Sequence, residues 1–129
     1  MISLKRRWIG KQQPFLDDVT TGDVLFIVKM PTLKDIQSNV TSGDYIFSDH
    51  AVKRMIKRDI LRREVEYALY QGEVIEEYPD DKYSPSCLVY GKTEAGRILH
   101  IQVSLPPTVV VITVYEPDPE EWVNGRNRR

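Results

Sequence analysis

A histidine stands among basic residues in the segment Ser-Asp-His-Ala-Val-Lys-Arg-Met-Ile-Lys-Arg, residues 48–58. Wound as a helix at about 100° per residue, this segment collects its imidazole and its cations on one face. The members of this basic face are His50, Lys53, Arg54, Lys57 and Arg58. Cations bind a phosphodiester, and an imidazole with a reference pKa of about 6.5 moves protons near neutral pH. An ordinary solvated helix face has the same composition, so both interpretations stand at this point.

Two residues further along the chain extend this chemistry. Metal-free RNA cleavage needs attack of the 2′-oxygen on phosphorus, stabilisation of the phosphorane and protonation of the leaving 5′-oxygen. We predict His50 and His100 as the proton-transfer residues and Arg54 as a ligand of the transition state. Tyr115, at the end of the last apolar run, can donate to phosphate or stack on a base. The predicted phosphate-binding residues are Lys53, Lys57 and Arg58.

Each candidate also has a purely structural interpretation. His50 can serve in local capping, and His100 can bond a neighbouring strand residue. Arg54 can pair with the acidic strand that contains Glu76. The two histidines lack the local spacing of a zinc site, so we expect neither a metal nor another cofactor. Cys87, the single cysteine, is expected to be a small buried residue rather than a nucleophile.

The charge of the chain is locally uneven. The 129 residues carry a net charge of −1, so no global field attracts nucleic acid. Residues 48–63 nevertheless hold six basic and two acidic residues, and residues 73–81 hold five acidic and no basic ones. A basic patch is therefore followed by an acidic one. No apolar stretch is long enough for a signal peptide or a membrane helix, and we expect a cytoplasmic protein without a membrane partner.

Capping patterns predict helices in the first half of the chain. Thr32, with Asp35 three residues later, begins a short amphipathic helix that ends near Gly43. Ser48 is the expected N-cap of the basic helix, where Asp49 lies at the positive end of the dipole.

The expected buried side of the basic helix consists of Ala51, Val52, Met55 and Ile56. A third helix is predicted from residue 61 or 62 to residue 71, and Gly72 is expected to adopt the left-handed conformation that follows it.

After Gly72 the hydrophobic period changes to two, and the strands 73–78, 86–92, 97–105 and 108–115 are predicted. Short connections favour antiparallel neighbours, and Pro106-Pro107 separates the last two strands. The last strand is apolar on both faces, so we expect it to be central. On the third strand, His100 is expected on a polar side, away from the core. The tail from Glu116 is expected to be frayed except at Trp122.

These elements predict the fold class α+β, with N-terminal helices packed on one face of a four-stranded antiparallel sheet. The predicted organisation is an N-terminal extension at residues 1–31, one α+β domain at residues 32–122 and a basic tail at residues 123–129. Within the extension, the apolar run 24–28 fits a strand or a buried helical turn.

Three motifs carry a resemblance to known proteins: His-Ala-x-x-Arg-Met at 50–55, Gly-Glu-Val-Ile-Glu-Glu-Tyr-Pro at 72–79 and Thr-Val-Tyr-Glu-Pro-Asp at 113–118. With them, the chain resembles a widespread prokaryotic family of uncharacterised small proteins, a domain of unknown function. It is also similar to RelE-type and MqsR-type ribonuclease toxins, in the superfold shared with barnase and the ribonuclease colicins. The resemblance implies a metal-independent endoribonuclease that acts on messenger RNA and is neutralised by a cognate antitoxin.

Two other functions fit the same residues. One is a non-enzymatic RNA-binding or ribosome-binding module, and the other is a protein-interaction domain of a toxin–antitoxin-like system that uses its acidic strand and Tyr78. The position of the site also has two solutions. A site at the rim of the sheet joins His50 with His100, whereas a site on the uncovered face excludes His50.

Overall fold

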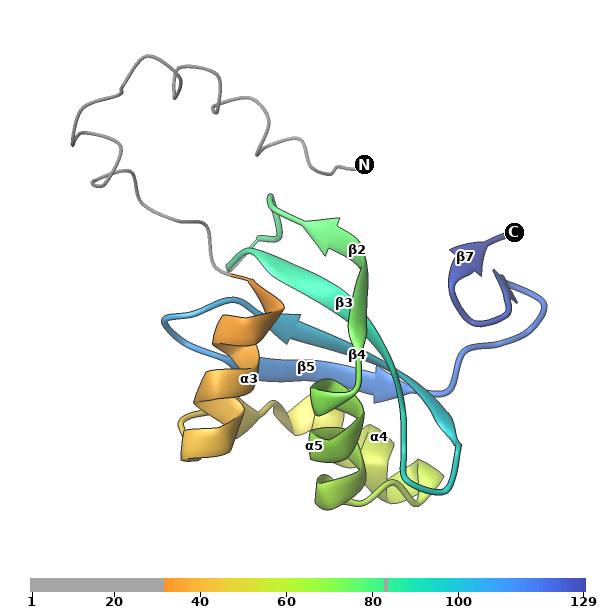
Figure 1. Cartoon of the computed structure of the whole chain (residues 1–129), viewed down its shortest axis with the longest axis horizontal. Helices are drawn as coiled ribbons and strands as arrows, with labels where there is room; N and C mark the ends of the chain where they lie inside the picture. The colour runs from red at the N-terminus through yellow and green to blue at the C-terminus, as the bar shows by residue number, and fades with distance from the viewer. Residues whose placement is uncertain (1–31, 83) are drawn as a thin grey trace, which may run out of the picture.

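The computed structural model describes residues 32–82 and 84–129 as an α+β fold. Its helices α3 (Leu33–Ser42), α4 (Asp49–Arg58) and α5 (Arg62–Tyr70) come before most of the sheet in the chain. They lie together on one side of the sheet, as Figure 1 shows. The predicted extension at residues 1–31, with its apolar run 24–28, lies outside the described residues.

The predicted caps of the first two helices are confirmed. The Asp35 carboxylate accepts hydrogen bonds from the backbone N–H and the hydroxyl of Thr32, at 2.7 and 3.0 Å. Gly43 ends α3 with φ +82°, which favours glycine. At α4, the hydroxyl oxygen of Ser48 accepts from the backbone N–H of Ala51 at 2.9 Å.

The predicted role of Gly72 after α5 is wrong, because its φ is not positive. The glycine is needed for close packing instead. A Cβ at this position would lie 2.6 Å from Cγ1 of Val89 and 2.8 Å from the carbonyl oxygen of Ala68. Absence of a side chain therefore lets the start of the sheet approach the end of α5.

The main sheet has five strands and is mixed, which corrects the expected four-stranded antiparallel sheet. The four predicted strands are present as β2 (Glu73–Tyr78), β3 (Ser86–Lys92), β4 (Ile98–Ser104) and β5 (Val110–Tyr115). The added strand is β1 (Ile46–Phe47), which pairs in parallel with β5. Two residues are too few to give a periodic pattern, so the sequence carries no signal for β1.

The strand order β1-β5-β4-β3-β2 also corrects the expectation that the last strand is central. On one side β5 pairs along its length with β4, but on the other side it meets only the two residues of β1. The central strand is β4. On the helix side, the apolar residues of β5 pack against α4.

The hydrophobic core lies between the helices and one face of the sheet. Its sheet residues alternate along β3 and β4, as predicted for a half-buried sheet. They are Cys87, Val89, Leu99, Ile101 and Val103. On β5 the core residues are Val111 and Val114, because the pairing with β4 shifts register between Val111 and Thr113. The intervening residues of β3 and β4 line the opposite face.

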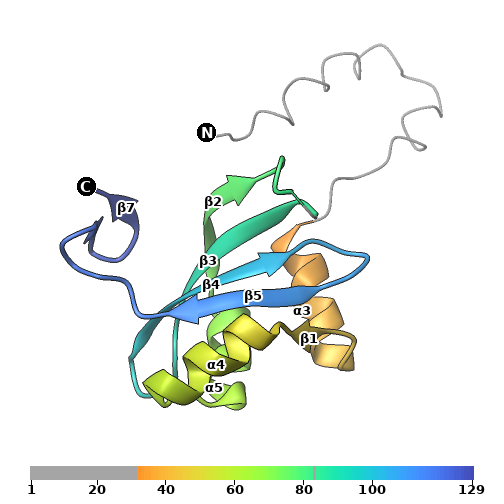
Figure 2. The ribbon, with the colours of Figure 1, turned by 180° about the vertical axis from the view of Figure 1, so that it is seen from behind.

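The buried side of α4 is narrower than predicted. Ala51 and Met55 are buried, but Val52 and Ile56 are 41% and 76% exposed. The helix lies along β5 near the end of the sheet (Figure 2), so a single row of residues at i, i+4 spacing contacts the strand. The sequence pattern cannot reveal this narrow contact, because it depends on which strand the helix covers.

The C-terminal tail is structured, which corrects the expected fraying. Strands β6 (Trp122–Val123) and β7 (Asn127–Arg128) pair as a small antiparallel sheet. This segment lies on the side of the main sheet that the helices leave uncovered (Figures 1 and 2). The predicted packing of Trp122 against the sheet is confirmed, since only 2% of its surface is exposed.

Candidate functional site

The start of the basic helix is fixed against β5. Ser48 donates its backbone N–H to the carbonyl of Val111 at 3.0 Å and its hydroxyl to the carbonyl of Ile112 at 2.8 Å. His50, the second residue of α4, follows this anchor and is exposed. The candidate imidazole therefore emerges beside the strand that carries Tyr115.

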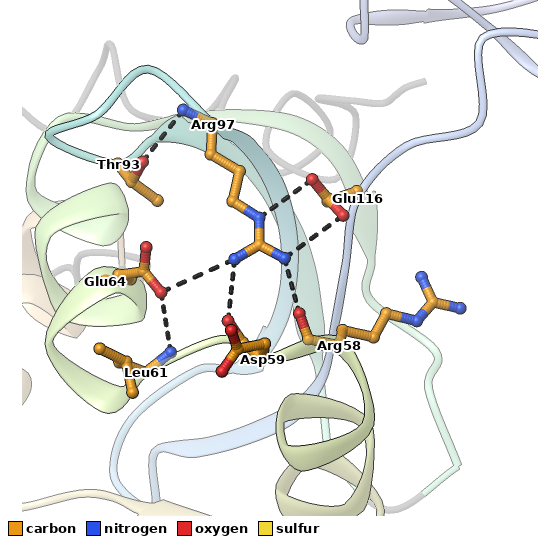
Figure 3. A network of polar contacts seen from close by, with 7 residues as sticks. All are labelled: Arg58, Asp59, Leu61, Glu64, Thr93, Arg97 and Glu116. Atoms are coloured by element: carbon orange, nitrogen blue, oxygen red, sulfur yellow. Dashed lines mark hydrogen bonds and ion pairs between the residues drawn. The ribbon is translucent and has the colours of Figure 1, made fainter.

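The end of α4 is held by Arg97, as Figure 3 shows. Its guanidinium donates to the carbonyls of Arg58 and Asp59 at 2.7 and 3.0 Å, and pairs with the Glu116 carboxylate at 3.0 Å. The hydrogen bond from Arg97 lowers the pKa of Glu116. A cation at the negative end of the helix also favours its dipole. Sequence reasoning missed Arg97, whose partners lie at the end of α4, at Glu64 on α5 and just after β5.

The predicted site residues Tyr115 and His100 are in contact. The phenol oxygen of Tyr115 lies 3.3 Å from Nδ1 of His100, and Nε2 lies 2.6 Å from the carbonyl oxygen of Gly125. A carbonyl oxygen only accepts, so Nε2 carries the proton. In the neutral ring Nδ1 is then an acceptor, and Tyr115 donates to it.

His100 faces away from the core as predicted, but it is fully buried rather than accessible. The Trp122 ring meets it edge-on, with centroids 4.5 Å apart and an interplanar angle of 90°. Burial lowers the pKa of His100, which favours its neutral form. The alternation along β4 correctly predicted which face of the sheet carries His100. The exposure of this residue depends on the tail that covers it, and the sequence pattern does not predict the position of the tail.

Arg128 fastens the tail over this histidine. Its guanidinium donates to both carboxylate oxygens of Glu76, at 2.6 and 3.1 Å, and lies 4.5 Å from the centroid of the Trp122 ring. Glu76, which was a possible partner of Arg54, is therefore bound by Arg128.

A second arginine repeats this arrangement one step along the tail. Arg126 lies 4.2 Å from the centroid of the Tyr90 ring and forms an ion pair with Glu73. Sequence reasoning missed both arginine contacts. The available signal was charge complementarity between the Arg-rich end of the chain and the acidic strand β2.

Arg54 connects the basic face with Tyr115. Burial raises the pKa of Tyr115, while the cations of Arg128 and Arg54 lower it to a smaller extent. Both guanidinium groups therefore lie within electrostatic range of the phenol. His50 and Arg54 are neighbours at i, i+4 spacing on α4, and Tyr115 and His100 contact each other on the sheet.

The three predicted phosphate-binding residues differ in their surroundings. Lys53 and Lys57 are exposed on α4, and Arg58 is half-buried. The charge of Arg58 contributes to the lowered pKa of Glu116, and its backbone carbonyl accepts from Arg97. Lys53 and Lys57 are directed to solvent, where they add to the field of the basic face.

Other chemical groups contribute less to this region. In the described parts of the chain, no group of three or more histidine, cysteine, aspartate or glutamate residues is arranged to hold a metal ion. Cys87 is buried as predicted, and burial raises the pKa of its thiol to about 12. None of the helices in residues 32–82 and 84–129 is long and apolar enough to cross a membrane.

The fold and this series of residues define a small α+β protein with a basic helix at one end of its sheet. Residues 47–116, more than half of the chain, match a family described as Domain of unknown function (DUF4258), and the chain belongs to this family. The matched range includes α4, Arg97, His100 and Tyr115, whereas the tail from Pro117 lies beyond it. The chain matches no curated protein and no solved structure.

Proposed function

We propose that this protein is a metal-independent endoribonuclease of the RelE and barnase type, which cuts messenger RNA as the toxin of a toxin–antitoxin pair. One observation carries the proposal. The exposed imidazole of His50 lies one helical turn from Arg54, whose charge acts on the Tyr115 phenol. A proton acceptor and a phosphate-binding cation are therefore adjacent at the rim of the sheet, and the charge of this cation reaches the phenol that donates to His100.

The proposed reaction uses the 2′-hydroxyl of RNA as its nucleophile, so DNA is not a substrate. His50 takes the proton of the 2′-hydroxyl while its oxygen bonds to phosphorus. Arg54 stabilises the additional negative charge of the phosphorane. The bond from phosphorus to the 5′-oxygen then breaks, and this oxygen takes a proton from water. The products are a 2′,3′-cyclic phosphate and a 5′-hydroxyl end, and His50 returns its proton to solvent.

In this mechanism His100 is a positioning residue. Both of its ring nitrogens are engaged, by Tyr115 and by the Gly125 carbonyl, and the ring is buried. It therefore acts through Tyr115, whose hydroxyl it orients at the rim. Lys53 and Lys57 bind neighbouring phosphates of the RNA chain.

Cleavage of a labelled single-stranded RNA in the presence of EDTA tests the proposal. We expect the wild-type protein to produce cyclic-phosphate ends, and His50→Ala to lower the rate about 100-fold or more, the usual contribution of acid–base catalysis. Arg54→Ala is expected to lower the rate as well. Lys34→Ala removes an exposed cation from α3 and is the matched control. An intact RNA, or equal rates for wild type and His50→Ala, contradicts the nuclease mechanism.

A binding module without chemistry is the second candidate, favoured by the burial of His100. With one accessible histidine on this surface, the basic face can bind RNA and leave it intact. RNA binding that weakens steeply with salt, together with uncut RNA, is the result that this candidate requires.

The exposed apolar residues of α4 support a protein antitoxin as a partner. Ile56 is 76% exposed and Val52 lies one turn away, next to the basic face. A partner that covers both side chains also shields the adjacent cations from RNA. Co-purification with the product of the adjoining gene tests this contact: Ile56→Glu should abolish it and Lys34→Glu should preserve it. Co-purification of the partner with the Ile56→Glu variant contradicts the proposal that Ile56 and Val52 form its binding surface.

A further inference from the structure

A groove of about 650 Å³ lies on the same sheet face as His100, toward the opposite end of β4. The tail covers the His100 end of this face, and the groove occupies the end near Ser104. Its lining combines an apolar wall with a few polar groups, as ligand sites commonly do. Its lining residues include Asp81, Gln102, Ser104, Pro107, Val110 and Ile112.

The carboxylate of Asp81 is held in a fixed position at this groove. Its Oδ2 atom accepts a hydrogen bond from the hydroxyl of Ser86 at 2.7 Å and from Nε2 of Gln102 at 3.3 Å. Gln102 also donates to Ser86 at 3.1 Å, which closes the network. Among the described residues, both bonds of the carboxylate fall on Oδ2, and Oδ1 has no hydrogen bond. A fixed anion repels phosphate and attracts a ligand with N–H donors.

The hydroxyl of Ser104 is engaged in hydrogen bonds within the loop between β4 and β5. Its hydroxyl donates to the carbonyl of Thr108 and accepts from the backbone N–H of Val110, both at 2.8 Å. Ser84 and Thr108 add hydroxyl groups to the lining. Asp81 is its charged group, and Pro107, Val110 and Ile112 are its apolar members. This combination suits a flat ring whose edge carries hydrogen-bond donors.

We propose that this groove binds an unpaired guanine base of an RNA whose phosphates lie on the basic face of α4. Guanine presents two adjacent donors, N1–H and the 2-amino group, to one carboxylate. The other bases offer fewer donors at this edge, since adenine and cytosine present one exocyclic amine and uracil one ring N–H. The inference rests on the proposed binding of RNA to α4, and it adds a base preference to that function.

Ile112 contacts both the groove and the start of α4. This residue lines the groove, and its carbonyl accepts a hydrogen bond from the hydroxyl of Ser48 at the N-cap of α4. His50 follows Ser48 by two residues. A single RNA strand that crosses β5 at this point can therefore place a base in the groove and the adjacent phosphate beside His50. The negative groove and the positive helix complement the two parts of a nucleotide.

Binding of pentanucleotides tests the inference without requiring cleavage. The probes have the sequence UUXUU, with X as each of the four bases, and 2′-fluoro sugars that remove the nucleophile. By fluorescence anisotropy, we expect the guanine probe to bind about tenfold more tightly than the other three, the discrimination of one bidentate contact. Asp81→Asn should reduce this preference to about twofold or less, because an amide is a poorer acceptor for two donors.

Arg54→Ala is the matched control for phosphate binding. It should weaken all four probes by a similar factor and leave the guanine preference intact. In the wild-type protein, guanosine monophosphate should shift the NMR signals of the Gln102 amide and the Ile112 methyl groups, whereas uridine monophosphate should not. This measurement applies even if Asp81→Asn fails to fold.

Equal affinity of the wild-type protein for the four probes overturns the inference, as does a guanine preference that survives Asp81→Asn. Absence of binding to every probe overturns it together with the proposed function. Guanine preference without cleavage of any RNA contradicts only the nuclease. Cleavage without base preference contradicts only the guanine site.

Discussion

The phenol oxygen of Tyr115 lies 3.3 Å from Nδ1 of His100, and the two residues are register partners on β5 and β4. Tyr115 also lies within range of the charge on Arg54 of α4. One side chain therefore links the basic helix to the sheet face that the tail covers.

Burial of His100 predicts that the protein loses stability in mild acid. Its pKa in the folded state lies below the unfolded value of about 6.5. Above that pH the imidazole of His100 is neutral in both the folded and the unfolded state. Below it, the imidazole takes up a proton in the unfolded chain but stays neutral in the folded protein. The free energy of unfolding should therefore fall as pH drops from about 7 to about 5. Urea denaturation across this range measures the effect.

Comparison of two variants assigns this pH dependence. His100→Gln should flatten the fall in stability, whereas the exposed His50→Ala should retain it. Glu76 and Arg128 face the same ring, and both are present in the two variants. An equal slope in wild type and His100→Gln contradicts the assignment.

Arg97 is predicted to stabilise the end of α4 through its planar guanidinium. Arg97→Lys keeps the positive charge but loses the fork that reaches Arg58 and Asp59 together. We expect a loss of about 1–3 kcal/mol in the free energy of unfolding, as for hydrogen bonds that involve charged groups. Chemical denaturation measures it, with the exposed Arg63→Lys as the control. Equal losses in the two variants contradict the role of the fork.

Gly91 is predicted to tolerate no side chain. A Cβ there would lie 2.1 Å from the carbonyl oxygen of Ala68, and a backbone atom within α5 cannot move aside cheaply. Gly91→Ala should therefore cost about 3 kcal/mol or more. Gly96→Ala is the informative comparison, because its φ is +90° but its surroundings are open. That change should cost only about 1–2 kcal/mol. A larger loss of thermal stability in Gly96→Ala than in Gly91→Ala contradicts the predicted clash with α5.

Cys87 is predicted to be unreactive in the folded protein. Its thiol is buried, and burial raises its pKa to about 12, so almost no thiolate is present at pH 8. We expect no reaction with a disulfide reagent until urea unfolds the chain, followed by rapid modification of one thiol. Rapid labelling without denaturant contradicts the buried position.

The local pattern of the sequence determined the elements of this fold. Thr32 and Ser48 mark helix starts because their caps depend on residues within the next turn. Alternation along β4 separated His100 from the core side, since side-chain direction follows the pleat. The basic face of α4 was readable for the same reason, because it depends only on helical spacing.

Contacts between distant segments decided the rest. Exposure of Ile56, pairing of β1 with β5 and burial of His100 all depend on which surfaces meet in three dimensions. Arg128 contacts Glu76 from 52 positions away in the chain, and no local period encodes such a pair. The sequence therefore determined which faces exist, and the tertiary structure decided which of them remain accessible, because accessibility is a property of packing between elements.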